Sequence, residues 1–325
     1  MPSELLTDIP QAGSQTGWPW SRPDSDRTES ETHFLNQTFP KITVITPSLN
    51  QAAYLEKTIR SVLLQNYPTL EYFIMDGGST DGSVEIIKKY AAHITDWVSE
   101  KDRGMCHAIN KGFARASGDI ICWLNSDDYF APDTLHFVAR NLPVSDEPAW
   151  LVGGVELLDA SGNKIFARGP AGEITRDRIL RWHENFLPQP STFWNKAMLR
   201  AAGTMDESLS YIMDLDLWLR MIPHGKPQII RMTLSLVHYH SKSKCITGRK
   251  KSLEELKIYY KQRNLVSPAE LNIILKGFQW PLPHYIRILQ QIRKISGDYA
   301  RVYFRRTKRW AGIFLDAILK IFHFS

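Results

Sequence analysis

Short apolar runs alternate with amphipathic stretches along residues 41–142 of this chain. The apolar runs predict strands over residues 41–49, 70–76 and 118–125. The stretches whose apolar residues recur at helical spacing predict helices over residues 53–65, 83–93, 105–117 and 132–142. Strands that are apolar throughout and alternate with helices are typical of a mostly parallel sheet covered on both faces, and thus of an α/β protein.

The pattern changes after Trp150. Residues 151–169 predict two strands joined by a turn at Ser161-Gly162-Asn163, a small antiparallel part beside the parallel sheet. Helices are expected near residues 174–182, 195–202 and 214–222, and a further strand at residues 228–240. From about residue 241 onward we expect only helices.

The chain divides into three predicted parts. Residues 1–39 are rich in Ser, Thr, Pro, Asp and Glu and lack any period, so we expect a flexible segment from which Trp18 and Trp20 dock on the body. Residues 40–248 form the predicted α/β domain, and residues 249–325 form a basic helical extension.

The composition is that of a folded protein, with 43% hydrophobic and 23% charged residues in a chain of 325. The three cysteines form no Cys-x-x-Cys pair, which favours a reducing compartment over secretion. The first residues lack the basic and apolar regions of a signal peptide, and no uncharged apolar run reaches about 18 residues. We therefore expect a cytoplasmic protein without a membrane span.

Charge is distributed unevenly along the chain. Residues 1–240 hold 22 Lys and Arg against 29 Asp and Glu, whereas residues 241–325 hold 18 against 5. A basic tail on an acidic body favours contact with an anionic surface, either phospholipid or nucleic acid. The sequence has no zinc-ligand spacing, RNP motif or helix-turn-helix pattern, so we expect no nucleic-acid partner.

Polar residues follow the predicted strands where these strands end. They form the segments Thr46-Pro47-Ser48-Leu49-Asn50, Asp76-Gly77-Gly78-Ser79-Thr80-Asp81-Gly82 and Asn125-Ser126-Asp127-Asp128. Ligands bind outside the carboxyl ends of the strands in open parallel sheets. Each segment alone reads equally well as an ordinary turn, but three at one sheet edge favour a binding site.

Two adjacent carboxylates, Asp127 and Asp128, end a very apolar run. Neighbouring anions repel each other, and a divalent cation with a substrate phosphate on its far side relieves this repulsion. Oxygen ligands favour Mg²⁺ or Mn²⁺. Neither Gly-x-Gly-x-x-Gly nor Gly-x-x-x-x-Gly-Lys-Ser/Thr is present, which argues against a dinucleotide oxidoreductase and a P-loop NTPase.

Four motifs, in their order and spacing, resemble glycosyltransferase family 2, the inverting enzymes with a GT-A fold, of the polysaccharide-biosynthesis type. The motifs lie in residues 42–83, 99–135, 187–221 and 237–248. The resemblance covers roughly residues 41–248. It implies a GT-A fold with a mostly parallel nucleotide-binding sheet and a small antiparallel acceptor-side part, followed here by a helical tail.

The resemblance also assigns roles on the donor side. Asp76 corresponds to the residue that binds the donor base, Asp127 to one that reaches the ribose, and Asp128 to a metal ligand. The other positions beside the donor are Thr46, Pro47, Asn50, Asp102, Arg103, Asn110 and Lys111. The chain departs from the family pattern at Met105-Cys106-His107, where a Gln and a further polar residue are usual, and this leaves the donor sugar open.

In the acceptor half, Asp214 corresponds to the aspartate of the family's Glu-Asp motif and is the candidate catalytic base. A carboxylate that removes the acceptor proton is the simplest route to inversion at the anomeric carbon. Met213 stands at the usual acidic position. A helix N-cap is the competing interpretation of Asp214. For Asp216, a further carboxylate two residues on, the alternative to a part in the acceptor site is a structural role.

His240 corresponds to a histidine close to the diphosphate or the metal, and it is the second candidate metal ligand. A purely structural histidine is the alternative, and His238 shares its face on an extended strand. Residues 189–192 resemble an acceptor-side loop.

We therefore expect a metal-dependent inverting glycosyltransferase that moves one sugar from a nucleoside-diphosphate sugar, preferably a UDP-sugar, to a glycan or lipid-linked glycan. A nucleotidyltransferase is an alternative, although the first-strand loop is not the glycine-rich basic loop that such enzymes normally have. A non-catalytic sugar-nucleotide-binding module is another, but the intact aspartates argue against it. Residues 306–310 imitate a motif of processive synthases, yet the chain lacks the spans of an export channel.

The tail carries five basic side chains within residues 301–309. Apolar residues follow at helical spacing, namely Trp310, Phe314, Ile318 and Ile321. This pattern suits a helix that lies in a membrane interface, which would place the enzyme on the inner face of the cytoplasmic membrane. A helix packed on the catalytic domain or on a dimer partner is the alternative.

Overall fold

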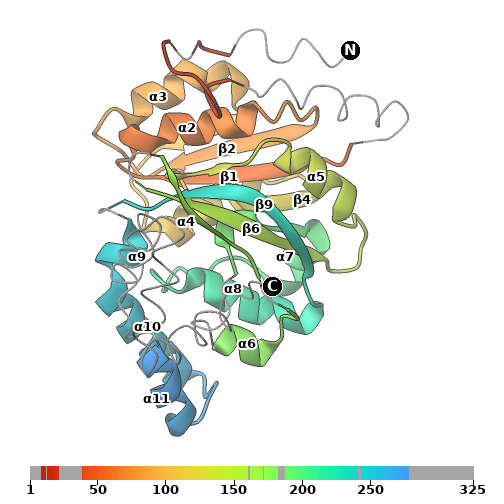
Figure 1. Ribbon diagram of the computed structural model, residues 1–325, viewed down its shortest axis with the longest axis vertical. Helices are drawn as coiled ribbons and strands as arrows, with labels where there is room; N and C mark the ends of the chain where they lie inside the picture. The colour runs from red at the N-terminus through yellow and green to blue at the C-terminus, as the bar shows by residue number, and fades with distance from the viewer. Residues whose placement is uncertain are drawn as a thin grey trace, which may run out of the picture.

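A mixed sheet forms the centre of the protein (Figure 1). The computed structural model describes residues 9–11, 13–21, 39–159, 162–170, 172–181, 187–240 and 243–277. One half of the sheet is parallel and has the strand order β3-β2-β1-β4. Its strands are β1 (Ile42–Ser48), β2 (Leu70–Asp76), β3 (Asp96–Ser99) and β4 (Ile120–Trp123). Ser48 lies opposite Asp76, so the polar loops after β1 and β2 begin side by side.

The other half of the sheet continues in the order β8-β6-β9-β5 and is mixed in direction. Its strands are β5 (Asp128–Phe130), β6 (Trp150–Leu158), β8 (Thr192–Asn195) and β9 (Gln228–His238). β8 runs antiparallel to β4 and β6, β9 runs parallel to β6, and β5 runs antiparallel to β9. β7 (Lys164–Arg168) pairs antiparallel with β6, which confirms the small antiparallel part predicted from the sequence.

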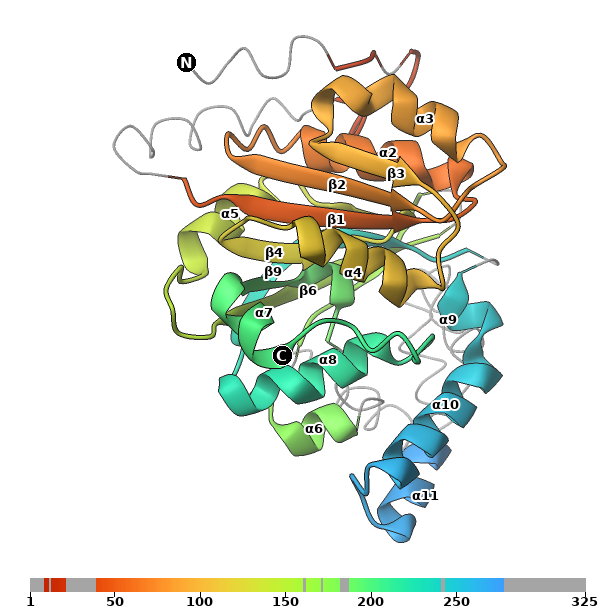
Figure 2. The same cartoon turned by 180° about the vertical axis from the view of Figure 1, so that it is seen from behind.

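Helices cover both faces of the sheet, with α2 and α3 on one side and α4, α7 and α8 on the other (Figure 1 and Figure 2). The helices beside the parallel half are α2 (Ala52–Leu63), α3 (Ser83–Tyr90), α4 (Met105–Arg115) and α5 (Thr134–Asn141). Those that follow are α6 (Arg176–Leu180), α7 (Lys196–Ala202), α8 (Met213–Met221), α9 (Lys244–Thr247), α10 (Arg249–Gln262) and α11 (Pro268–Gly277). Within the described ranges, no helix is both long and apolar enough to cross a bilayer.

The alternation of side chains along β1 explains the two layers. Ile42 and Val44 pack with Leu55 of α2 in one buried cluster, whereas Ile45 packs with Ile109 of α4 in the other. Successive residues of a strand point to opposite faces, so a strand that is apolar throughout needs cover on both sides. The sequence pattern thus accounts for the layer order.

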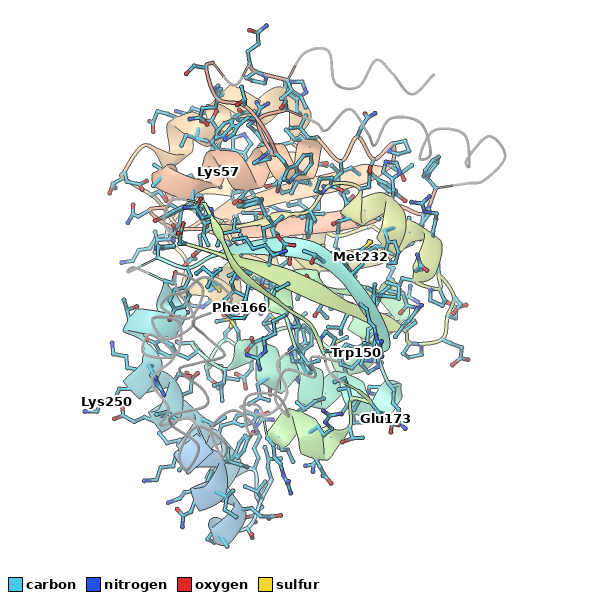
Figure 3. The ribbon with its side chains drawn as sticks, viewed as in Figure 1. Lys57, Trp150, Phe166, Glu173, Met232 and Lys250 are labelled. Carbon is cyan, nitrogen blue, oxygen red and sulfur yellow. The ribbon has the colours of Figure 1, made fainter. Side chains whose placement is uncertain are left out.

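Four tryptophans join the sheet to α8. Trp123, Trp150, Trp194 and Trp218 are all fully buried, and the ring of Trp218 from α8 stacks on Trp123 and on Trp150 at centroid distances of 5.9 and 5.8 Å. Trp150 lies on β6 in the interior (Figure 3). Large aromatic side chains that bury this fully hold α8 firmly against the sheet.

The helices α10 and α11 pack on the same core as α8. Leu256, Tyr260, Leu271 and Ile274 belong to the buried cluster that contains Trp218, and the hydroxyl of Tyr260 donates to the carbonyl of Leu180 at 2.7 Å. The predicted boundary at residue 248 therefore separates α10 and α11 from α8, although these three helices share one core. The tail at residues 301–309 and its apolar stripe lie outside the described residues.

A short N-terminal segment lies against α2, as expected for Trp18 and Trp20. The buried guanidinium of Arg60 donates to the carbonyls of Pro10, Pro19 and Trp20 at 2.6 to 3.1 Å. The indole of Trp18 donates to the carbonyl of Phe130 at 2.7 Å. A buried charge needs such partners, so Arg60 and this segment stabilise each other.

The structure differs from the sequence prediction mainly in short elements. β3, β5 and β8 have three or four residues each and were not expected. Asp128, expected in a loop, is the first residue of β5, where it pairs with Val237. The helix predicted from residue 132 begins at Thr134, after Asp133 in a left-handed conformation with a φ of 57°.

Candidate functional site

The loops after β1 and β2 are bound to each other. The side-chain oxygen of Asn50 accepts a hydrogen bond from the N–H of Thr80 at 2.9 Å, and the N–H of Asn50 donates to the hydroxyl of Ser79 at 2.7 Å. The hydroxyl of Thr46 pairs with that of Tyr72 inside the sheet at 3.1 Å. Pro47 is buried in β1, beside Met75 of β2. The structure therefore brings these predicted donor-side residues to one sheet edge, with Thr46 and Pro47 in the supporting layer.

Asp76 ends β2 as a fully buried carboxylate. It accepts hydrogen bonds from the N–H groups of Gly78 and Ser79 at 3.1 and 2.8 Å, and from the hydroxyls of Ser79 and Ser99. Several donors around one carboxylate fix its orientation. The hydroxyl of Ser48, opposite Asp76, is buried and has no hydrogen-bond partner among the described residues, a polar group that the sequence analysis did not single out.

The loop before α4 reaches this edge through Asp102. A Cβ atom at Gly77 would lie 2.7 Å from Oδ2 of Asp102, so the absence of a side chain at Gly77 makes room for that carboxylate. Oδ1 of Asp102 accepts from the N–H of Gly104 at 2.9 Å, just before α4 begins. Lys111 on α4 forms an ion pair with Glu100 at 3.1 Å.

Asn110 and Arg103 face the other half of the site. The side chain of Asn110 bonds both the N–H and the carbonyl of Met205, at 2.9 and 3.0 Å. Glu207 accepts from Asn110 at 3.1 Å and from Arg103 at 2.6 Å. Predicted as donor-side residues, both here fasten the loop that leads to α8, and the sequence analysis missed Glu207 as their partner.

The acidic pair after β4 has two different environments. Asp127 is partly exposed, and its Oδ2 lies 3.3 Å from Nε2 of His240. Asp128 is buried, and its carboxylate accepts only a long hydrogen bond, 3.3 Å, from the amide of Asn125 among the described residues. Burial and the neighbouring charge of Asp127 raise the pKa of Asp128 well above its usual value.

The two histidines at the end of β9 are clearly distinguished. His240 stacks on Tyr54 of α2 with ring centroids 4.2 Å apart, and its buried Nδ1 has no hydrogen-bond partner within the described part of the chain. His238 packs edge-on against Tyr54 and Tyr129 instead. Burial and the charge of Lys57, which lies on α2 (Figure 3), lower the pKa of His238 to about 4, so this histidine is neutral.

These residues fit a cation only in part. Asp127 and His240 present a carboxylate and an imidazole beside each other, but the described residues contain no group of three or more His, Cys, Asp and Glu that could hold a metal. A divalent ion at this place would therefore need further ligands from a substrate, such as the oxygens of a diphosphate.

Asp214 lies in the first turn of α8, at the second helical position. Its side chain is half-buried, and Oδ1 accepts from the N–H of Leu215 at 2.8 Å. Burial raises the pKa of Asp214 to about 6, against the opposing effects of that hydrogen bond and of the Lys244 ammonium. Ile212 rather than Asp214 stands at the N-cap position, so the competing N-cap interpretation of Asp214 does not describe its place.

Asp216 is fully buried behind the site. It accepts from the hydroxyl of Tyr259 at 2.7 Å and from Nε of Arg220 at 2.9 Å. Its carboxylate thus ties α8 to α10, which is the structural role considered for it from the sequence.

The loop that resembles an acceptor-side segment is buried beneath the acidic pair. Gln189 donates to the carbonyl of Trp123 at 2.8 Å and accepts from Asn125 at 3.0 Å, and Ser191 donates to the carbonyl of Gly154 at 2.7 Å. Through Asn125, Gln189 supports the loop that carries Asp127 and Asp128.

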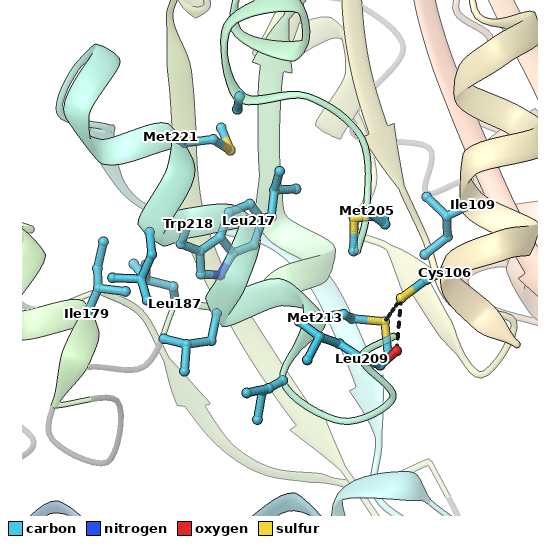
Figure 4. Packing of buried hydrophobic residues seen from close by; sticks show 14 of the residues in the cluster. Cys106, Ile109, Ile179, Leu187, Met205, Leu209, Met213, Leu217, Trp218 and Met221 are labelled. Atoms are coloured by element: carbon cyan, nitrogen blue, oxygen red, sulfur yellow. Dashed lines mark hydrogen bonds between the residues drawn. The ribbon is translucent and has the colours of Figure 1, made fainter. Parts of the chain in front are cut away.

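Two departures from the family pattern meet in the core. The thiol of Cys106 lies 3.4 Å from the sulfur of Met213 and 3.3 Å from the carbonyl of Leu209 (Figure 4). Both side chains are buried, and burial raises the pKa of Cys106 to about 12, so the thiol stays protonated. The contact joins α4 directly to the start of α8.

Comparison with known proteins identifies the family. Residues 43–143 match the model of glycosyl transferase family 2. An uncharacterised glycosyltransferase of Mycobacterium tuberculosis is 30% identical over 201 residues, which are 60% of this chain and 74% of that protein.

Solved structures agree in fold. S. aureus TarS 1–349 in complex with UDP-GlcNAc superposes with a TM-score of 0.52 at 18% identity, over 73% of this chain and 71% of that one. The mannosyltransferase PcManGT from Pyrobaculum calidifontis, in complex with GDP-Man and Mn²⁺, gives 0.51 at 18% identity, over 85% and 81%. The protein therefore has the GT-A fold of these enzymes. Together with the sequence matches, this fold shows that the chain belongs to glycosyltransferase family 2.

Proposed function

We propose that this glycosyltransferase is metal-dependent and inverting, and that it transfers one sugar from a UDP-sugar to a hydroxyl of a glycan or lipid-linked glycan. The observation that carries the proposal is the separation of two acidic centres. Asp127 stands beside His240 at the carboxyl edge of the sheet, and Asp214 stands at the start of α8 with a pKa of about 6. Inversion by direct displacement needs one centre for the leaving diphosphate and another for the acceptor proton.

On the donor side, the rigid carboxylate of Asp76 suits the N–H of a pyrimidine base, because its hydrogen bonds to the β2 loop fix its direction. The complex of TarS with UDP-GlcNAc supports a uridine donor, whereas the mannosyltransferase neighbour carries GDP-Man. Asn50 and Asp102, which the loop contacts bring to this edge, are proposed to complete the nucleoside pocket.

For the metal we propose Asp127 and His240 as the protein ligands, with Asp128 as a buried support in place of the ligand role expected from the sequence. Asp127 is the carboxylate beside Nε2 of His240, and Nδ1 of that histidine has no hydrogen-bond partner among the residues that the structure describes. A bound Mg²⁺ or Mn²⁺ would stabilise negative charge on the departing diphosphate. The Mn²⁺ in the mannosyltransferase complex supports this assignment.

For the chemistry we propose that Asp214 removes the proton of the acceptor hydroxyl. The acceptor oxygen then forms its bond to the anomeric carbon while the bond from that carbon to the diphosphate oxygen breaks, and the electron pair leaves with the nucleoside diphosphate. A carboxyl whose pKa is about 6 is ionised at neutral pH yet more basic than an ordinary aspartate. The proton ends on Asp214 and passes to solvent.

Thermal unfolding with UDP-, GDP- and dTDP-sugars, each with and without Mn²⁺, tests the donor part of this proposal. A ligand at 100 times its Kd stabilises the folded state by about 2.7 kcal/mol, which raises the midpoint by several degrees. We expect UDP-sugars to give the largest rise, and only with the cation. A protein that no nucleotide sugar stabilises under either condition contradicts the proposal.

We propose further that the enzyme is cytoplasmic and meets a lipid-linked acceptor at an anionic membrane, through the basic residues 301–309. Each Lys or Arg near such a surface contributes about 1 kcal/mol, so five would hold the enzyme there at low salt. In sedimentation with phosphatidylserine liposomes, the full chain should pellet at low salt and be released at high salt. A variant with Arg305, Arg306, Lys308 and Arg309 replaced by serine should stay in solution. Full-length protein that ignores the liposomes contradicts the membrane proposal.

A further inference from the structure

We infer that Glu255 on α10 is a positioning residue that holds the base-bearing start of α8 in its reactive geometry. The inference rests on the proposed role of Asp214 as the base. It assigns to α10, a helix beyond the motifs shared with the family, an indirect part in the transfer reaction, through the position of Asp214.

Glu255 binds three consecutive N–H groups directly before α8. Its Oε1 accepts from Ser210 at 2.7 Å, and its Oε2 accepts from Tyr211 at 2.7 Å and from Ile212 at 2.9 Å. The first N–H groups of a helix have no partner within the helix, and the side chain of Ile212 at the N-cap offers none. A carboxylate from α10 therefore binds the N–H of the N-cap residue Ile212 and the two N–H groups before it, with charge-assisted hydrogen bonds that hold the entry into α8 and complement the helix dipole.

The capped segment determines where Asp214 points. Asp214 follows Ile212 by two residues, and its carboxyl is oriented by the N–H of Leu215 within the same first turn. A shift of the backbone at Ile212 therefore moves the carboxyl of Asp214 with it. Catalytic groups lose much of their effect when they are displaced by about 1 Å.

Glu255 is itself held in place by the contacts of α10. Tyr259, one turn further along this helix, donates to Asp216 of α8 at 2.7 Å, and Arg263, a further turn on, donates to Asp206 at 3.0 Å. Before Glu255, a Cβ atom at Gly248 would lie 2.0 Å from the ring of Tyr211. Lys250 points away from the body on the outer side of α10 (Figure 3). After the carboxylate, α10 is thus joined to α8 by the bond from Tyr259 to Asp216, and before it Gly248 packs closely against Tyr211.

The charged groups around Asp214 make the coupling measurable. Glu255 on α10 raises the pKa of Asp214 and Lys244 on α9 lowers it, while the thiol of Cys106 on α4 stays neutral nearby. Glu255→Gln removes one negative charge from this set. The acidic limb of the rate profile should therefore move to lower pH, because the loss of a negative charge near Asp214 lowers the pKa of its carboxyl.

The test compares Glu255→Gln with Glu254→Gln, the same chemical change at the adjacent exposed residue of α10. For Glu255→Gln we expect kcat to fall by roughly 10- to 30-fold, donor KM to stay within about twofold, and the acidic limb to shift to lower pH. For Glu254→Gln we expect wild-type kinetics. In an Asp214→Asn background, Glu255→Gln should lower the residual rate by less than about threefold, because residues that act as a unit are not additive.

Three outcomes overturn the inference. The first is equal kcat values in the two glutamine variants, and the second is an unshifted pH profile for Glu255→Gln. The third is a Glu255→Gln substitution that lowers the rate by the same factor in the wild type and in the Asp214→Asn background. Should Glu255→Gln unfold at the assay temperature, Gly248→Ala serves instead, because it displaces Tyr211 without a change of charge. It should lower kcat with no shift of the acidic limb, and unchanged kcat in this variant overturns the inference too. High turnover in Asp214→Asn alone refutes the proposed base directly, a result separate from any result at Glu255.

Discussion

Asp214→Asn is expected to lower the rate of sugar transfer by roughly 10²- to 10⁴-fold while donor affinity stays within about twofold. Asparagine keeps the shape of the side chain and can still accept the hydrogen bond from Leu215, but it cannot take the acceptor proton. Single-turnover transfer rates and donor titrations measure the two quantities separately. In the wild type, kcat should rise with pH through an apparent pKa near 6, and this limb should vanish in the variant.

The same substitution should make the protein more stable at alkaline pH. Burial raises the pKa of Asp214 from 3.8 to about 6, so folding disfavours the ionised carboxyl, and this cost grows as the pH rises from about 4 to above 6. We expect the variant to gain about 1–2 kcal/mol in unfolding free energy at pH 8. Below pH 4 we expect no gain, since the Asp214 carboxyl is then protonated in both the folded and the unfolded protein. A variant that keeps half of the wild-type turnover shows that the base lies elsewhere.

Removal of divalent cations by EDTA, and the substitution Asp127→Asn, should each reduce transfer by at least about 10²-fold. A cation at the leaving diphosphate supplies several kcal/mol of charge stabilisation, and 1.4 kcal/mol corresponds to a factor of ten. Added Mn²⁺ should restore the EDTA-treated wild type, whereas Asp127→Asn should stay impaired and its nucleotide binding should no longer depend on the cation. Calorimetric titration with UDP, with and without Mn²⁺, measures this dependence.

Asp128→Asn is the matched comparison, because it makes the same change one residue away in a buried side chain. It should keep the cation dependence of UDP binding, since Asp127 and His240 remain in contact. If Asp128→Asn loses that dependence while Asp127→Asn keeps it, the ligand role belongs to Asp128, as the family resemblance implies. Nucleotide binding that ignores EDTA in the wild type rules out both assignments.

The sequence predicted most of the helices and strands, the four-residue β4 among them, but missed the short strands β3, β5 and β8. β1, β2 and β6 show apolar runs long enough to stand out, and α4 shows a regular apolar face. β5 and β8 have three and four residues, and their pairing partners lie far away along the chain. Such strands exist because of tertiary pairing, so local propensity carries little information about them.

The same distinction applies to the site. The polar residues that follow β1, β2 and β4 could be located from the sequence, because the carboxyl ends of parallel strands lie at the same edge of the sheet. The stacking of Tyr54 on His240 and the support of Asn125 by Gln189 depend on contacts between distant segments. Glu255 lies in a helix with many charged residues, for which the sequence pattern predicts exposure to solvent. Only the packing of α10 on α8 reveals the hydrogen-bond partners of Glu255.

The contact between Cys106 and Met213 couples the effects of substitutions at the two positions. A carboxylate introduced at position 213 alone would be buried against a protonated thiol and would lose much of its hydration. A polar residue introduced at position 106 alone would face the apolar thioether. A substitution at either position therefore alters the surroundings of the other, so we expect the effects of changes at positions 106 and 213 on stability to be non-additive.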